Sequence, residues 1–170
     1  MNNKFNYILY EARSFSKSYK LLKSQVETEE EAESYIIPSV VIMTFCTELY
    51  LKAILYYYNI SFNKNKGHKL DYLFSLLSEI NDSNAYKSYS NIEKSFEYKK
   101  KEKNNFFLYN SLKEMLKNEN NSFEMWRYRF DDWKNFRCMF PASEFKILIN
   151  CLEEECKALE KKIKEISIYE

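Results

Sequence analysis

Three polar residues interrupt an otherwise apolar stretch of this chain, and their types and spacing suit chemistry. Residues 38–58 read PSVVIMTFCTELYLKAILYYY, and Thr44, Glu48 and Lys52 recur there at intervals of four. Four-residue spacing places side chains on one face of a helix, so the sequence predicts a polar stripe along a mostly buried helix. Burying a lone charge is costly, so Glu48 and Lys52 require charged or hydrogen-bonding partners.

The Glu48–Lys52 pair has two interpretations. The two side chains either form a buried structural ion pair or line a polar cavity that holds a ligand. Arg127 is the partner expected for Glu48, because a guanidinium pairs with a carboxylate through two parallel hydrogen bonds and tolerates burial better than an ammonium does.

The only histidine, His68, follows the only glycine, Gly67. Histidine is the side chain that changes charge near neutral pH, so His68 is a candidate for acid–base work on a 2′-hydroxyl or a phosphate. The alternative is a histidine that simply caps or packs at the start of a predicted helix.

Residues 122–140, SFEMWRYRFDDWKNFRCMF, concentrate aromatic and arginine side chains. Bases of any sequence stack on aromatic rings and arginine binds phosphate, so Arg127, Tyr128 and Arg129 are candidates for holding RNA or a nucleotide. The alternative is that this segment forms part of the hydrophobic core and of the exposed rim around it. The pattern does not distinguish a helix from an ordered loop.

The composition limits the fold class to all-α. The chain has 170 residues but only one glycine and two prolines, too few for the turns of a hairpin-rich protein. Its length predicts one domain over residues 1–170. The net charge of +1 gives no general attraction to nucleic acid, and the acidic run 27–33 and the basic run 94–103 are interpreted as solvated faces rather than a dedicated binding patch.

The sequence offers no set of metal ligands and no glycine-rich phosphate loop, so we expect neither a metal nor a cofactor. Four cysteines without C-x-x-C spacing predict reduced thiols: Cys46, Cys138, Cys151 and Cys156. The N-terminus lacks the features of a signal peptide, and the longest charge-free apolar-rich run, 34–47, is too short to span a bilayer. We therefore expect a soluble, cytoplasmic protein with no membrane contact.

Hydrophobic periodicity predicts the helices. The clearest helices are predicted over residues 4–25, 68–80 and 142–168, with a central helix that ends at about 59. The central helix starts either near Glu31, with Pro38 as a kink inside it, or near Ile37, with Pro38 in its first turn, and we favour the kink. The signal is weaker between 85 and 121, where it predicts one helix through residues 86–96 and another over 106–116, joined by the basic linker 99–105. The long last helix either seals the bundle or forms the seam of a dimer.

Two linked motifs resemble the HEPN superfamily. They are E-L-x-L-K-A at residues 48–53 and G-H-x-L-x-x-L-F at residues 67–74, and the W-R-Y of residues 126–128 fits the same branch. The resemblance implies an up-and-down bundle, here of about five to six helices, and usually a homodimer. It also implies a prokaryotic toxin–antitoxin or anti-phage (antiviral) defence system, in which many members cut RNA without metal. Others bind nucleotides or are inert partners of a nucleotidyltransferase.

The chain departs from the ribonuclease pattern of that superfamily, an arginine and a later histidine with four to six residues between them. Ser61, Phe62 and Asn63 occupy the positions where His68 would require the arginine, and no histidine follows Arg127. We expect RNA or nucleotide to bind in a polar cleft lined by Glu48, Lys52, His68, Arg127 and Tyr128. If RNA is cut, His68 and Arg127 are the expected catalytic residues. The alternative is a non-catalytic, dimerising subunit that regulates a partner enzyme such as a nucleotidyltransferase.

Overall fold

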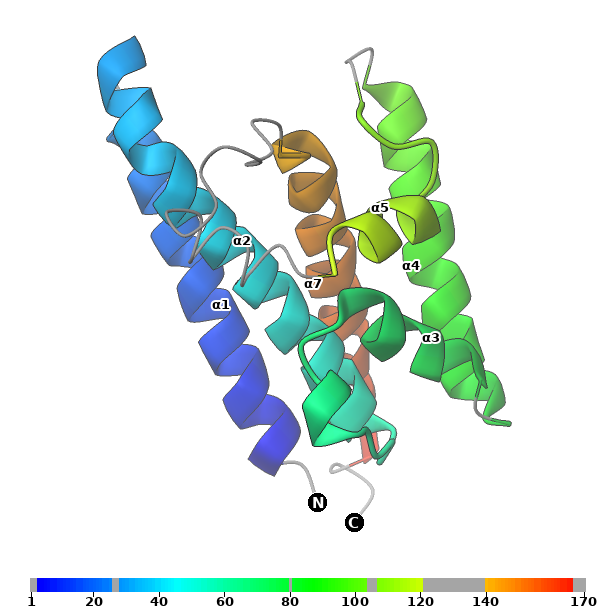
Figure 1. Ribbon diagram of the computed structural model, residues 1–170. Coiled ribbons are helices and arrows are strands. Elements are labelled where there is room, and N and C mark those ends of the chain that lie inside the picture. Colours follow the sequence, from blue (N-terminus) through cyan, green and yellow to red (C-terminus); the bar gives the residue numbers. More distant parts are fainter. Residues whose placement is uncertain (1–2, 26–27, 80, 104–106, 121–139, 167–170) are drawn as a thin grey trace.

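Every regular element in the described part of the chain is a helix. The computed structural model describes residues 3–25, 28–79, 81–103, 107–120 and 140–166. Four long helices form the bundle, and the short helices α3 and α5 contact each other and α4 (Figure 1). The α-helices are α1 (Asn3–Ser24), α2 (Glu29–Tyr57), α3 (Leu70–Glu79), α4 (Ser83–Glu102), α5 (Leu112–Asn118) and α7 (Ala142–Ile166). The prediction of an all-α helical bundle is confirmed.

Helix α2 is the central element of the bundle, because it packs against α1, α3 and α7. Its segment Tyr35–Tyr57 is long and apolar enough to cross a membrane, by length and composition alone. The sequence prediction had considered only the shorter charge-free run. Half of the most apolar window is buried inside the protein, so packing in a helical core accounts for its composition.

Helix α2 contains a proline and ends in a defined turn. Pro38 lies inside the helix, as predicted. After the C-terminal end of the helix, Asn59 adopts a positive φ of 54°. The amide of Asn59 donates to the carbonyl of Tyr56 at 3.2 Å, and the amide of Ile60 donates to the carbonyl of Leu55 at 2.9 Å. These two bonds form a Schellman motif, in which asparagine tolerates the left-handed position better than most residues. The chain turns there into the loop that carries His68.

Residues 99–102 belong to helix α4, whereas the sequence predicted a linker over 99–105. Helix α4 continues to Glu102, so its last lysines are helical. The Nζ atom of Lys99 lies 2.5 Å from the carboxylate of Glu154 on α7, and Lys100 donates to the backbone carbonyl of Tyr109. These contacts link the end of α4 to other segments of the chain. The pattern of residues within α4 does not reveal them.

The predicted helix over 106–116 begins later than expected. Residues 107–111 are irregular, and α5 begins at Leu112 after Ser111, whose hydroxyl accepts from the amide of Glu114 at 3.2 Å. The carboxylate of Glu144 accepts from the amide of Leu108 at 2.6 Å. This contact with α7 holds the segment out of a helix.

The last helix seals the bundle. The apolar side chains of α7 from Phe145 to Leu159 are buried in the protein's own core. The homodimer stays a prediction. A dimer interface along α7 would have to use another face of this helix, because the apolar stripe is buried inside the protein.

Candidate functional site

Glu48 is the centre of the candidate site. Its side chain is only 2% exposed, and its Oε1 atom accepts a hydrogen bond from Nζ of Lys52 at 2.5 Å. The Nδ1 atom of His68 lies 3.1 Å from both carboxylate oxygens of Glu48. The structure therefore brings together three of the predicted site residues around one buried carboxylate.

The threonines of the polar stripe need no partner outside α2. The hydroxyl of Thr44 donates to the carbonyl of Val40 at 3.0 Å, and that of Thr47 donates to the carbonyl of Met43 at 2.9 Å. Hydroxyls in a helix commonly bond back to the preceding turn in this way. Among these four polar residues, only the charged Glu48 and Lys52 are left to interact with another element.

The loop between α2 and α3 positions His68. The side chain of Asn63 accepts from the amide of Asn65 at 2.9 Å and caps a short 3₁₀ helix, Lys64–Lys66. Gly67 follows in a tight space, where a Cβ atom would lie 3.3 Å from the ring of Phe62 and 3.2 Å from the carbonyl of Lys64. A larger residue at position 67 would displace these neighbours. The glycine thus allows the loop to fold back beside α2.

His68 has one nitrogen held by the protein and a ring that is open to solvent. Its side chain is 59% exposed, in contrast to the buried carboxylate that it contacts. An ionised carboxylate only accepts hydrogen bonds, so the Nδ1 atom carries the proton and donates to Glu48. In the neutral ring this leaves the lone pair on Nε2, as in a general base oriented by a carboxylate.

Positive charges surround His68 along the loop. Lys64, Lys66 and Lys69 are exposed, and they form no ion pair with an acidic side chain in the described ranges. Lys52 already neutralises Glu48, so the charge of the loop lysines is unbalanced. An exposed imidazole among unpaired ammonium groups suits a phosphate anion.

The partner predicted for Glu48 was Arg127, but the carboxylate contacts Lys52 and His68 in the structure. Arg127, Tyr128 and Arg129 lie outside the described residues, so their predicted roles stay untested. The sequence prediction missed the loop lysines, although their placement at one, two and four residues from the only histidine was a readable signal.

A cavity of about 510 Å³ lies elsewhere, between α3, α4 and α5, and is lined by residues that include Phe74, Tyr89 and Lys113. Glu48, Lys52 and His68 do not line it, so the predicted cleft at these residues is not this cavity. Among the described residues no group of His, Cys, Asp and Glu side chains could hold a metal ion. Cys46, Cys151 and Cys156 are buried free thiols.

No protein-family model, curated protein or solved structure matches the chain. The fold and the site define a helical-bundle protein with a carboxylate-held, solvent-exposed histidine. The HEPN resemblance therefore rests on the two sequence motifs alone.

Proposed function

We propose that this is a HEPN-like protein of a prokaryotic anti-phage defence or toxin–antitoxin module, and that it binds RNA or a nucleotide at the Glu48–His68 site. The observation that supports the proposal is the exposed ring of His68, held through Nδ1 by the buried carboxylate of Glu48. A structural histidine needs only the buried contact. Here the other edge of the ring is available to a ligand.

The charges of the site favour a phosphate ligand. The Glu48–Lys52 pair has no net charge, and Lys64, Lys66 and Lys69 add positive charges that form no ion pair with a described carboxylate. His68 adds a further positive charge when it is protonated. Phosphates of RNA or of a nucleotide are the anions that such a cluster attracts.

Cleavage of RNA would be the stronger form of this function. The 2′-hydroxyl would lose its proton and attack the phosphorus, the bond to the 5′-oxygen would break, and that oxygen would take up a proton. His68 can serve as one of the two groups that move protons. The described residues do not supply the arginine of the usual motif, so binding is the function proposed, and cleavage is tested with the same variants.

The test measures binding of a fluorescein-labelled U15 RNA by anisotropy, and cleavage of the same RNA on gels, in EDTA. We expect Lys64→Gln/Lys66→Gln/Lys69→Gln to weaken RNA binding by about 10-fold and to reduce its salt dependence. The control is Lys87→Gln/Lys94→Gln/Lys162→Gln, which removes the same charge from exposed positions elsewhere. It should bind within about twofold of the wild type.

Cleavage by the wild type should fall about 10²-fold or more in His68→Ala if His68 moves protons. If the protein only binds, His68→Ala should retain RNA affinity within a few-fold. ATP as an unlabelled competitor tests the nucleotide form of the proposal. A wild-type protein that neither cleaves nor retains RNA or ATP refutes the proposal and leaves the regulatory subunit.

A further inference from the structure

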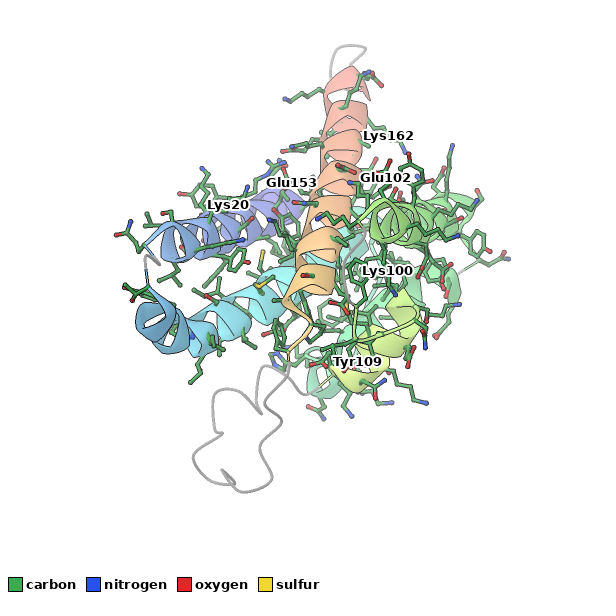
Figure 2. The ribbon with its side chains drawn as sticks, turned by 90° about the horizontal axis from the view of Figure 1, so that it is seen from above. Lys20, Lys100, Glu102, Tyr109, Glu153 and Lys162 are labelled. Atoms are coloured by element: carbon green, nitrogen blue, oxygen red, sulfur yellow. The ribbon has the colours of Figure 1, made fainter. Side chains whose placement is uncertain are left out.

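A basic groove lies between α1 and α7. One cavity of about 190 Å³ is lined by residues that include Lys20, Lys23 and Lys146, and a second of about 190 Å³ adds Lys17 and Lys157. The two cavities share residues of both helices, namely Ser16, Lys20, Ile149 and Asn150, so they form one continuous groove. Figure 2 shows Lys20 on α1 and Glu153 on the neighbouring α7.

The lysines of the first cavity lack acidic partners. Lys20, Lys23 and Lys146 form no ion pair with any carboxylate of the described residues. Repulsion by Lys23, burial, and repulsion by Lys103 and Lys20 lower the pKa of Lys146 from its ordinary value. The folded protein therefore concentrates positive charge there at a cost in stability.

Two carboxylates of α7 beside α1 are already engaged. Glu153, which lines the second cavity, accepts from Nε of Arg13 at 3.1 Å and from the hydroxyl of Tyr50 at 2.7 Å. Glu160 accepts from the same guanidinium at 2.7 Å and 2.9 Å. These carboxylates are committed to the helix packing, so the lysines at the other end of the groove are left for an external anion.

The floor of the groove is suited to a nucleotide chain. Ile149 is buried, Tyr19 is half-buried, and the side chains of Ser16 and Asn150 offer hydrogen-bonding groups. Single-stranded RNA binds where a positive groove follows the backbone and aromatic rings meet the bases. Each cavity is smaller than the roughly 300–1,000 Å³ of a small-molecule pocket, which favours an extended segment over an enclosed ligand.

We propose that the groove between α1 and α7 binds the phosphate backbone of single-stranded RNA through Lys20, Lys23 and Lys146. This site goes beyond the Glu48–His68 site and shares no residue with it. Lys20 and Lys23 of the groove lie near the end of α1 that joins α2. The loop bearing His68 follows the opposite end of α2 (Figure 1).

The test compares U15 RNA binding by the full chain between 50 and 300 mM salt, on the order of the range where counterion release is measurable. Lys20→Gln/Lys23→Gln/Lys146→Gln should bind about 10-fold more weakly. Its log–log salt slope should be smaller by about 2, since each lost phosphate contact on a single strand removes about 0.7. Lys87→Gln/Lys94→Gln/Lys162→Gln lowers the net charge equally and should retain wild-type binding.

One further variant and one stability measurement exclude trivial explanations. Lys20→Arg/Lys23→Arg/Lys146→Arg keeps the charges and should keep the affinity. The glutamine triple variant should fold at least as stably as the wild type, because it relieves like-charge repulsion. This stability is checked by urea denaturation.

The outcomes separate this site from the Glu48–His68 site. If the groove variant loses RNA while the loop variant Lys64→Gln/Lys66→Gln/Lys69→Gln keeps it, the groove is the RNA site and the proposed function of the loop fails. If the groove variant binds like its charge-matched control, the inference is overturned, whatever the loop variant does. Wild-type protein that binds no RNA overturns it as well.

Discussion

The Nδ1 atom of His68 lies 3.1 Å from both carboxylate oxygens of Glu48. This contact joins the central helix to the loop that follows it, and it joins a buried group to an exposed one. The carboxylate also accepts from Lys52 at 2.5 Å, so a single buried anion orients two polar side chains. The orientation of His68 is thus fixed from within the bundle, while its ring meets solvent.

The first prediction concerns the tautomer of His68. Because Glu48 accepts from Nδ1, the neutral ring should carry its proton on Nδ1 and leave Nε2 unprotonated. His68 is the only histidine, so ¹⁵N NMR of the ring nitrogens needs no assignment. Glu48→Gln should weaken the preference, since an amide can accept or donate. A wild-type ring protonated on Nε2 would contradict the geometry.

The second prediction concerns stability. Glu48→Ala should lower the free energy of unfolding by about 2–3 kcal/mol, below the roughly 3–5 kcal/mol for breaking a fully buried pair. The reason is that the side chains of Lys52 and His68 are 17% and 59% exposed, so both can reach water once the carboxylate is removed. Urea denaturation measures the loss.

A double variant separates the charge from the packing at this position. Glu48→Leu/Lys52→Met removes both charges of the helix pair and should be more stable than Glu48→Leu alone, because no cation is left without its anion. A double variant less stable than the single one would show that the pair does not act through charge.

The long helices could be predicted because their apolar residues recur regularly and are buried where the pattern places them. Phe145, Leu148, Leu152 and Leu159 on α7 are all fully buried. Burial of Glu48 was also predictable, since its neighbours along α2 are apolar. These features depend on local sequence and on the helical repeat.

The direct contact of His68 with Glu48 could not be predicted, because it depends on an irregular loop. His68 reaches the carboxylate only after the positive φ of Asn59 and the close packing of Gly67 on Phe62 have turned the chain. No periodicity specifies such a path. The irregular conformation of residues 107–111 could not be predicted for the same reason. The carboxylate of Glu144, on a helix more than thirty residues later, accepts a hydrogen bond from the amide of Leu108.

The third prediction concerns a buried polar cluster between α4 and α7. Ser88 donates to the carboxylate of Glu155 at 2.5 Å, and the hydroxyls of Ser88 and Tyr58 are 2.7 Å apart. A carboxylate only accepts, so the single proton of Ser88 goes to Glu155, and Tyr58 donates to Ser88. Ser88→Ala would remove the acceptor of Tyr58 and the donor to Oε1 of Glu155, whose Oε2 atom still accepts from the side-chain amide of Asn91 at 3.3 Å.

Ser88→Ala should therefore cost about 1–3 kcal/mol of unfolding free energy. Ser18→Ala is the matched control, because Ser18 is exposed and its hydroxyl only bonds back to the carbonyl of Ser14 at 3.0 Å. The control should change stability by less than about 0.5 kcal/mol. Equal losses in the two variants would mean that the buried cluster is not stabilising.

The fourth prediction concerns the ion pair that joins α1 to α7. Arg13 donates to the two carboxylate oxygens of Glu160 at 2.9 Å and 2.7 Å. These hydrogen bonds lower the pKa of the Glu160 carboxyl from its ordinary value of 4.5, against an opposing effect of burial. A depressed pKa in the folded state stabilises the protein above the unfolded pKa, and this stabilisation is lost as the pH falls through the folded value.

Glu160→Gln should thus be less stable than the wild type at pH 7, by about 1 kcal/mol for so exposed a pair. The difference should stay constant down to about pH 5 and then shrink below pH 4.5, because the carboxyl of the unfolded chain takes up its proton there while that of the folded protein stays ionised to a lower pH. Urea denaturation of both proteins between about pH 3 and 7 measures it. Glu165→Gln is the control, since Glu165 and Lys161 form an exposed pair 3.8 Å apart, and it should match the wild type throughout. If the stability difference between Glu160→Gln and the wild type became larger in acid, this result would contradict the lowering of the Glu160 pKa by Arg13.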